Sequence, residues 1–372
     1  MKTAMDSKIS FLDLKRQYQQ IKSETLQAIE QVMEQSAFSG GLFVKQFEKE
    51  FAAYCQTQYA VAVNSGTSAL HLAMRALGVK EGDEVIVPAN TFIATAWGVS
   101  HAGATPVFVD CDANTWNLSP EKVKAKINSR TKAIIGVHLY GQPCDLIALL
   151  KIAGENKIAF VEDAAQAHGA LYANKKIGGF GEMCCFSFYP GKNLGAYGEG
   201  GGVITNNAAY AEKIKLLRNQ GSVVKYYHEA IGYNERMDGI QGAVLSVKLK
   251  YLDGWNARRK AIAKMYQHGI THAAIKMQQP QPNAESVYHL FVITTENRDA
   301  LMKHLNEHAI YPGQHYPVPC HLQKAYAHLN YKKGDCPNAE YLAEHCLSLP
   351  MYAELTDEEV SRVIDAVNQF KG

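Results

Sequence analysis

The chain has 372 residues, of which 47% are hydrophobic and 20% charged, which excludes a disordered or fibrous protein. Its 38 Lys and Arg nearly balance 36 Asp and Glu, so the net charge of +2 predicts neither a nucleic-acid nor a membrane partner. The N-terminus lacks the apolar core of a signal peptide, and no apolar run is long enough to span a bilayer. The eight scattered cysteines form no CxxC pair, so we expect no metal site and, from free thiols, a cytoplasmic location.

Hydrophobic periodicity predicts strands that alternate with helices through the first two thirds of the chain. Helices are expected over residues 14–33, 43–54, 69–77, 93–102, from 120 onward, 146–153 and 208–218. Strands are expected over residues 59–63, 84–87, 105–109, 133–138, 158–162, 184–188 and 203–205. This alternation favours an α/β fold with a mainly parallel central sheet covered by helices on both faces.

The pattern changes after residue 220. Residues 222–238 show no clean period and are predicted to be an extended loop. Helices are expected over 239–252, 258–268, 299–307 and 356–370, and a strand over 288–294. We therefore predict a large α/β domain over residues 1–254 and a small α+β domain over residues 255–372, with the N-terminal helix as a candidate to pack on the small domain.

A glycine-rich loop follows the predicted strand 184–188. It reads YPGKNLGAYGEGGG from Tyr189 and presents one lysine, Lys192, after a Pro-Gly turn. A desolvated lysine at such a turn has a lowered pKa and can act as a nucleophile in Schiff-base chemistry. A solvated loop lysine is the alternative that this stretch alone leaves open.

The turn NSGTS at residues 64–68 lies between a predicted strand and a predicted helix. Free amide groups and the helix dipole at such a turn favour a bound phosphate, and hydroxyl side chains add donors. Simple N-capping by serine is the equally supported alternative. Neither GxGxxG nor GxxxxGK[ST] is present here, which disfavours a dinucleotide or ATP site.

Candidate site residues follow several of the predicted strands directly. They are Gly66, Thr67, Phe92, His138, Asp163 and Lys192. Ligands of parallel sheets bind outside the carboxyl ends of the strands, so these residues should converge at one edge. A lysine, an acid, a phosphate-binding turn and an aromatic ring are the groups that pyridoxal phosphate (PLP) requires. For Asp163, N-capping of the next helix remains the alternative, and for His138 a satisfied position in the core.

Together these stretches resemble the DegT/StrS family of sugar aminotransferases, which have the aspartate-aminotransferase fold (fold type I) of PLP enzymes. The resemblance covers nearly the whole chain and rests on five motifs in order. These are NSGTSAL (64–70), PANTFIAT (88–95), EDAAQAHGA (162–170), FSFYPGKNLGAYGEGG (186–201) and GYNERMDGIQGA (232–243).

The resemblance implies a role for each matching residue. Lys192 matches the imine-forming lysine, and Asp163 the acid at the pyridine nitrogen. Gln166 matches the side chain that bonds the ring hydroxyl, and Phe92 the aromatic that stacks on the ring. The phosphate-binding residues correspond to Gly66, Thr67 and Ser187. Asn234 matches an asparagine that reaches the phosphate of the neighbouring subunit, which implies a homodimer with shared active sites.

The resemblance also implies the substrates, L-glutamate and a nucleotide-linked sugar. Pro190-Gly191-Lys192 is similar to members that aminate C3 of a dTDP-linked 3-keto-6-deoxyhexose in deoxyamino-sugar or polysaccharide synthesis. Four residues are candidate sugar contacts, namely Tyr189, His315, Tyr316 and His321. The alternatives are amination at C4, a UDP-linked sugar, or a PLP-dependent sugar dehydratase. Relatives of the last kind carry histidine in place of the lysine, so Lys192 favours transamination.

Overall fold

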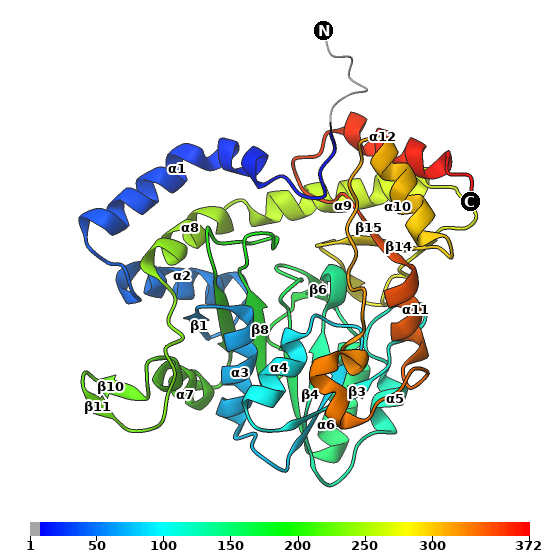
Figure 1. Cartoon of the computed structure of the whole chain (residues 1–372). Coiled ribbons are helices and arrows are strands. Elements are labelled where there is room, and N and C mark those ends of the chain that lie inside the picture. The colour runs from blue at the N-terminus through cyan, green and yellow to red at the C-terminus, as the bar shows by residue number, and fades with distance from the viewer. Residues whose placement is uncertain (1–7) are drawn as a thin grey trace.

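The fold is built on one seven-stranded sheet with strand order β1-β9-β8-β5-β4-β2-β3 (Figure 1). The structure is a computed structural model that describes residues 8–372. The strands of the sheet are β1 (Tyr59–Val63), β2 (Glu84–Pro88), β3 (Thr105–Val109), β4 (Thr131–Val137), β5 (Ala159–Asp163), β8 (Met183–Ser187) and β9 (Gly201–Thr205). Only β9 runs antiparallel to its neighbours, β1 and β8, so the predicted mainly parallel sheet is confirmed.

Helices cover both faces of this sheet (Figure 1). They are α2 (Gly41–Tyr54), α3 (Gly66–Leu77), α4 (Ala94–His101), α5 (Pro120–Lys124), α6 (Leu146–Asn156), α7 (Ala208–Arg218) and α8 (Gly239–Leu249). Successive strand residues point to opposite faces. Ile86 of β2 accordingly packs into one hydrophobic cluster, whereas Val85 and Val87 pack into the other. The apolar runs in the sequence are therefore strands buried on both sides.

A second, three-stranded sheet follows in the C-terminal third of the chain, with order β12-β14-β15. Its strands are β12 (Lys276–Met277), β14 (Phe291–Thr294) and β15 (Cys346–Leu349), and the nearby helices are α9 (Leu252–Gly269), α10 (Arg298–Glu307), α11 (Pro337–His345) and α12 (Asp357–Asn368). All of these elements except α11 share a third hydrophobic cluster, to which Ile9 also contributes. The predicted division into domains at residue 254 stays a prediction.

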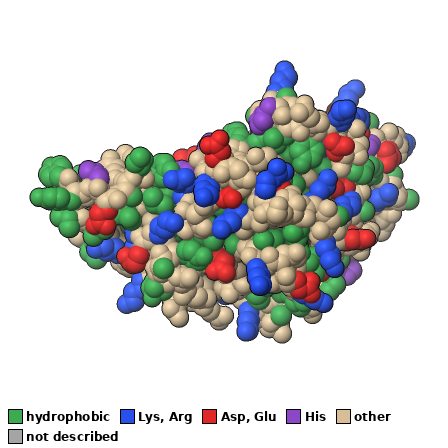
Figure 2. All heavy atoms as spheres, turned by 90° about the horizontal axis from the view of Figure 1, so that it is seen from below, with side chains coloured by type: hydrophobic (Ala, Val, Ile, Leu, Met, Phe, Trp, Pro, Cys, Tyr) green, Lys and Arg blue, Asp and Glu red, His purple; other side chains and the backbone are tan. Residues whose placement is uncertain are grey.

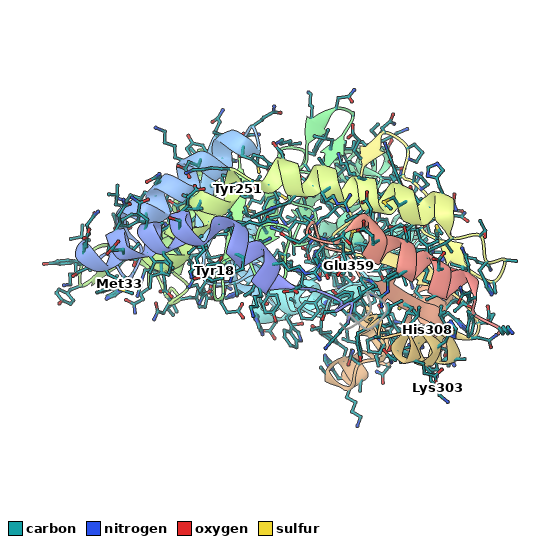
Figure 3. The ribbon with its side chains drawn as sticks, turned by 90° about the horizontal axis from the view of Figure 1, so that it is seen from above. Tyr18, Met33, Tyr251, Lys303, His308 and Glu359 are labelled. Carbon is teal, nitrogen blue, oxygen red and sulfur yellow. The ribbon has the colours of Figure 1, made fainter. Side chains whose placement is uncertain are left out.

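The N-terminal helix α1 (Leu14–Glu34) lies across the top of the molecule with α9 and α12 (Figure 3). Near its start, Arg16 donates two hydrogen bonds to Glu359 of α12, at 2.7 and 2.6 Å. The capping box of Thr356 and Glu359 also fixes the start of α12. A bidentate pair of this kind ties the beginning of α1 to the C-terminal elements.

The structure differs from the expected elements in several places. The segment predicted to be a loop over 222–238 contains the hairpin β10 (Ser222–Val224) and β11 (Tyr227–His228). Its turn requires a positive φ at Tyr226, which a sequence without glycine there does not signal. Helix α11 and strand β15 were not predicted, because they follow a segment rich in Pro and His. The remaining short strands are β6 (Leu171–Tyr172), β7 (Lys175–Lys176) and β13 (Ala284–Glu285).

The aromatic core beneath β8 should dominate the stability of this half of the molecule. Phe51 of α2 contacts the rings of Phe186 and Phe188 at centroid distances of 5.0 and 5.2 Å. We expect Phe51→Ala to lower the free energy of unfolding by about 3–5 kcal/mol, because the cavity cannot collapse fully. Urea unfolding measures this. The control Ile147→Ala, at a residue 59% exposed, should change it by no more than about 0.5 kcal/mol.

Candidate functional site

The last residue of β5, Asp163, is buried at the carboxyl edge of the sheet. Its carboxylate accepts hydrogen bonds from the Thr95 hydroxyl at 2.8 Å and from the Ala165 amide at 3.1 Å. Burial raises the pKa of this carboxyl, whereas the two hydrogen bonds and the charge of Lys192 lower it. No helix follows Asp163 directly, so its carboxylate is not a helix N-cap.

Lys192 lies in the loop between β8 and β9. Its amide donates to the Tyr189 carbonyl at 2.8 Å, which closes the turn that carries the side chain. Burial lowers the pKa of the Lys192 amine to about 8, and the charge of Asp163 opposes this effect. At pH 7 about a tenth of the amines is therefore neutral, which is the form that acts as a nucleophile.

Gln166 connects the turn after β5 to the segment around residue 316. It accepts from the Tyr140 amide at 2.7 Å and donates to the Tyr316 hydroxyl at 2.8 Å. The Tyr140 hydroxyl in turn donates to the His315 carbonyl at 2.6 Å. The ring of Tyr316 lies 5.6 Å from that of Phe92, which is 51% exposed. The structure thus brings together the residues predicted to meet the cofactor ring and two of the predicted sugar contacts.

The predicted phosphate turn lies beside the end of β8. Ser65 caps α3, and its hydroxyl accepts from the Ser68 amide at 3.0 Å. A Cβ on Gly66 would lie 2.6 Å from Cβ of Ser187, so only glycine allows this close approach. The amides of Gly66 and Thr67 precede the hydrogen bonds of the helix itself and point out of its N-terminus. Gly66, Thr67 and Ser187 are therefore placed at one helix end.

His315 packs on the N-terminal segment. Its ring stacks on Phe11 at 5.2 Å, and its Nδ1 lies 2.9 Å from the Ser348 hydroxyl. Burial and the charge of Lys192 lower the pKa of His315 to about 4, so the ring is neutral near neutral pH. Tyr189, a further predicted sugar contact, is 54% exposed.

Three other predicted residues are not joined to this group. His321 is buried, and its Nε2 lies 3.0 Å from Oε1 of Glu340 in α11. A contact between His321 and a sugar would require this segment to move. Asn234 is exposed, and no described contact links it to Lys192 in the same chain. His138 is a core residue, bonded to Glu162 at 3.1 Å and to the Cys144 amide at 3.1 Å.

Sequence reasoning missed residues that complete the site. Thr95 falls within a quoted motif, but nothing in the sequence indicates that its hydroxyl reaches Asp163. Phe11 precedes the first helix, in a stretch without periodicity. His289 is half-buried, and its Nδ1 lies 3.1 Å from the side-chain oxygen of Asn193. All three depend on contacts between segments far apart in the chain.

Comparison with known proteins gives the class of this fold. The sequence pattern of the DegT/DnrJ/EryC1/StrS aminotransferase family matches residues 19–368. A dTDP-3-amino-3,4,6-trideoxy-alpha-D-glucose transaminase from Streptomyces venezuelae is 46% identical over 364 residues, 98% of this chain and 96% of the relative. A dTDP-3-amino-3,6-dideoxy-alpha-D-galactopyranose transaminase from Aneurinibacillus thermoaerophilus is 44% identical over 362 residues, 97% of this chain and 99% of the relative.

A solved structure, described as ntda from Bacillus subtilis with bound cofactor PMP, superposes with a TM-score of 0.91 at 31% identity. The match covers 99% of this chain and 86% of that one. Fold and matches together define an aminotransferase. The chain belongs to the DegT/DnrJ/EryC1/StrS aminotransferase family, which confirms the resemblance, the fold and the enzyme class predicted from its motifs.

The low pKa of Lys192 can be tested in the protein without cofactor. The rate of its acylation by acetic anhydride should rise with pH with a midpoint near 8, because only the neutral amine reacts. Peptide mass spectrometry measures this rate. In Asp163→Asn the midpoint should fall further, because the charge of Asp163 raises the pKa of the lysine. A midpoint near the ordinary value of 10.5 would contradict the proposed burial of the amine.

Proposed function

We propose that the chain is a PLP-dependent transaminase that moves the amino group of L-glutamate to C3 of a dTDP-linked 3-keto-6-deoxyhexose. The product is a dTDP-3-amino-3,6-dideoxyhexose. The observation that carries the proposal is the electrostatic pairing of a half-buried Lys192 of lowered pKa with a buried Asp163. Both relatives above are named dTDP-3-amino-sugar transaminases, which supports C3 and dTDP. Their products differ at C4, and the proposal leaves that configuration open.

The residues present fit PLP. Lys192 supplies the amine that would hold the cofactor aldehyde. Asp163 lies close enough to interact electrostatically with that amine. The N-terminus of α3 and the hydroxyls of Thr67 and Ser187 suit its phosphate. The amide nitrogen of Gln166 has a second hydrogen besides the one used by Tyr316, so it can also donate to the ring hydroxyl.

Phe92 would cover one ring face. When bound, the cofactor supplies an electron-accepting ring that stabilises charge developing on the substrate carbon. Asp163 would keep a proton on the pyridine nitrogen and so preserve that property. The hydrogen bonds from Thr95 and the Ala165 amide oppose the rise in the pKa of Asp163 that burial causes, because hydrogen bonds to a carboxylate favour the charged form.

Lys192 would move the protons of both half-reactions. Its neutral amine would take the proton from the glutamate α-carbon in the first half-reaction. In the second, the protonated amine would deliver a proton to C3 of the sugar. A pKa of about 8 suits both tasks, because a general acid and base works best when its pKa lies near the working pH. The neutral ring of His315 would form a hydrogen bond with the sugar and would leave proton transfer to Lys192.

Three alternatives use the same scaffold. Amination at C4 or a UDP-linked sugar would leave the Lys192 chemistry unchanged and differ only in the sugar contacts. A PLP- or PMP-dependent sugar dehydratase would yield a deoxygenated sugar without consuming glutamate. Lys192 supports transamination over dehydration. Assays with dTDP- and UDP-linked 3-keto and 4-keto sugars, with detection of 2-oxoglutarate, separate these possibilities.

The proposed assembly is a homodimer with shared active sites. Hairpin β10–β11 projects from the body of the subunit (Figure 1), and hydrophobic side chains gather at this end of the molecule (Figure 2). Ile231 beside it is 89% exposed. An exposed apolar patch of this kind marks an interface, and a second copy would place Asn234 toward the partner's phosphate. No helix in the described part of the chain has the length and hydropathy of a membrane span. The eight buried, free cysteines support a cytoplasmic location.

The visible spectrum of the purified protein tests the cofactor, the lysine and the donor together. We expect a yellow band that bleaches on addition of L-glutamate and is missing in Lys192→Ala, which should retain the fold and lose all turnover. Asp163→Asn should fold and lose at least about 100-fold in kcat, because the ring proton is no longer held. Substantial transamination by Lys192→Ala, or a near-normal rate in Asp163→Asn, would contradict the proposed roles.

Shared sites can be tested by mixing two defective variants. Lys192→Ala and Asn234→Ala should each be weak alone. After dissociation and reassociation in equal amounts, activity should recover to about a quarter of wild type, because half of the dimers are mixed and each has one complete site. The two variants mixed without dissociation are the control. No recovery above that control would refute a site built from both subunits.

A further inference from the structure

Helix α8 contains a buried lysine that the proposed chemistry does not use. Lys248 is 1% exposed, whereas the other buried residues of this helix are glycine or apolar. Removing an ammonium group from water is unfavourable unless specific partners compensate. The partners of Lys248 therefore indicate what the residue does.

Both close partners of Lys248 belong to the loop that carries Lys192. Its Nζ donates to the Gly195 carbonyl at 2.7 Å and lies 4.1 Å from the centroid of the Tyr197 ring. Glu354, the charge that raises its pKa, forms no described hydrogen bond with it, and burial lowers the pKa of Lys248 to about 7. The Nζ group of Lys248 is thus held chiefly by the loop, through one carbonyl and one aromatic face.

The same helix holds the loop at a second point. Oε1 of Gln241 accepts from the Tyr197 amide at 2.9 Å. Gln241 and Lys248 are seven residues apart, about two helical turns, so both face the loop from one side of α8. The ring of Tyr18 in α1 also contacts the Tyr197 ring, with 6.1 Å between the two centroids (Figure 3 labels Tyr18).

The turn at Gly195 is coupled to the backbone of Lys192. A Cβ on Gly195 would collide with the Pro190 carbonyl oxygen, so the loop folds back tightly onto the turn that presents the lysine. The Ala196 amide donates a hydrogen bond to the Phe188 carbonyl at 2.8 Å, which holds the loop in this tight turn. A group that fixes the Gly195 carbonyl therefore also limits the directions open to Lys192.

We propose that Lys248 is a positioning residue that fixes the direction of Lys192 by holding the Gly195 carbonyl and the Tyr197 ring against α8. The catalytic consequence rests on the proposed function, whereas the effect on the loop does not. Loss of Lys248 should loosen the loop in the protein without cofactor and should slow the step that needs the Lys192 amine.

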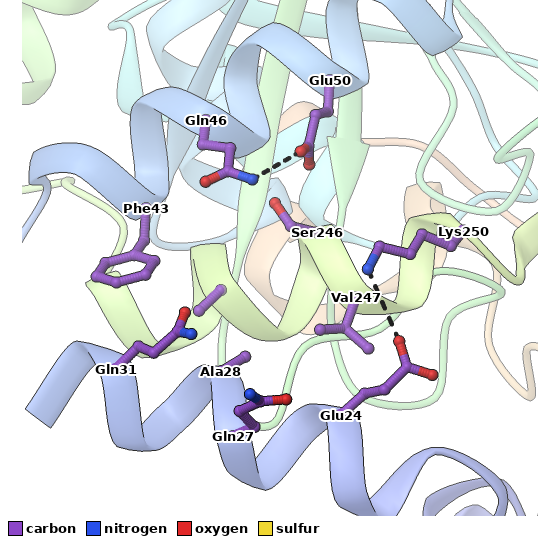
Figure 4. Close-up of a pocket in the computed structure, with 11 residues that line it drawn as sticks. Glu24, Gln27, Ala28, Gln31, Phe43, Gln46, Glu50, Ser246, Val247 and Lys250 are labelled. Carbon is purple, nitrogen blue, oxygen red and sulfur yellow. Dashed lines mark hydrogen bonds and ion pairs between the residues drawn. The ribbon is translucent and has the colours of Figure 1, made fainter.

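The chain offers a matched control two residues further on. Lys250 is 67% exposed, and its Nζ lies 3.7 Å from Glu24 of α1. Figure 4 shows its side chain pointing toward Glu24, beside a cavity between α1, α2 and α8. Lys250→Met removes the same charged side chain from the same helix without touching the loop.

The experiment compares Lys248→Met, Lys248→Arg and Lys250→Met. In the cofactor-free proteins, hydrogen exchange is measured on peptides that span residues 189–200. We expect exchange at least about tenfold faster in Lys248→Met, partial recovery in Lys248→Arg and wild-type exchange in Lys250→Met. In the loaded enzymes, kcat of Lys248→Met should fall by at least about tenfold while KM for glutamate changes by less than about twofold.

Wild-type exchange in residues 189–200 together with wild-type kcat in Lys248→Met would overturn the proposal. If Lys248→Met does not fold, Lys248→Gln, whose shorter side chain retains a donor, provides the same comparison and the same decision. Because hydrogen exchange is read without cofactor or substrate, loosened exchange with no transaminase activity in any variant, wild type included, would refute the proposed function and leave the positioning role supported.

Discussion

The site depends on two opposite charges that are both removed from water at one edge of the sheet. The Lys192 amine and the Asp163 carboxylate each favour the charged form of the other, while burial opposes both. Burial favours the neutral amine that Lys192 needs as a nucleophile, whereas it disfavours the carboxylate form of Asp163. A buried carboxylate needs more partners than the Lys192 amine alone. The Thr95 hydroxyl and the Ala165 amide provide them as hydrogen-bond donors to Asp163.

The geometry of the sheet brings Asp163 and Lys192 to the same edge. Asp163 ends a strand whose neighbours run parallel to it, so its carboxylate lies where loops from several strands meet. Strand β9, the one antiparallel member, returns the chain immediately after the glycine loop and pairs with β8. Helices α3 and α8 then cover the loop from two sides, one with its N-terminus and the other with Gln241 and Lys248.

Much of this arrangement was predictable from the sequence. Apolar runs predicted all seven strands of the large sheet. Because residues that follow parallel strands meet at the carboxyl edge of the sheet, the sequence also predicted that Asp163 and Lys192 lie close together. Side-chain direction was not predictable, because long-range contacts determine it. His321 is buried against Glu340 because α11, which the sequence pattern did not reveal, packs there. Phe11 reaches His315 only because the N-terminal segment pairs with residue 310 of the C-terminal part.

The loop between β8 and β9 is closed at its base by backbone contacts alone. Ser187 pairs with Gly201, and the Phe188 amide donates to the Gly200 carbonyl at 2.7 Å. None of these bonds involves the side chain at position 192. A scaffold of this kind can therefore exchange that one side chain during evolution, and with it the type of reaction, while the sheet and its helices are inherited unchanged.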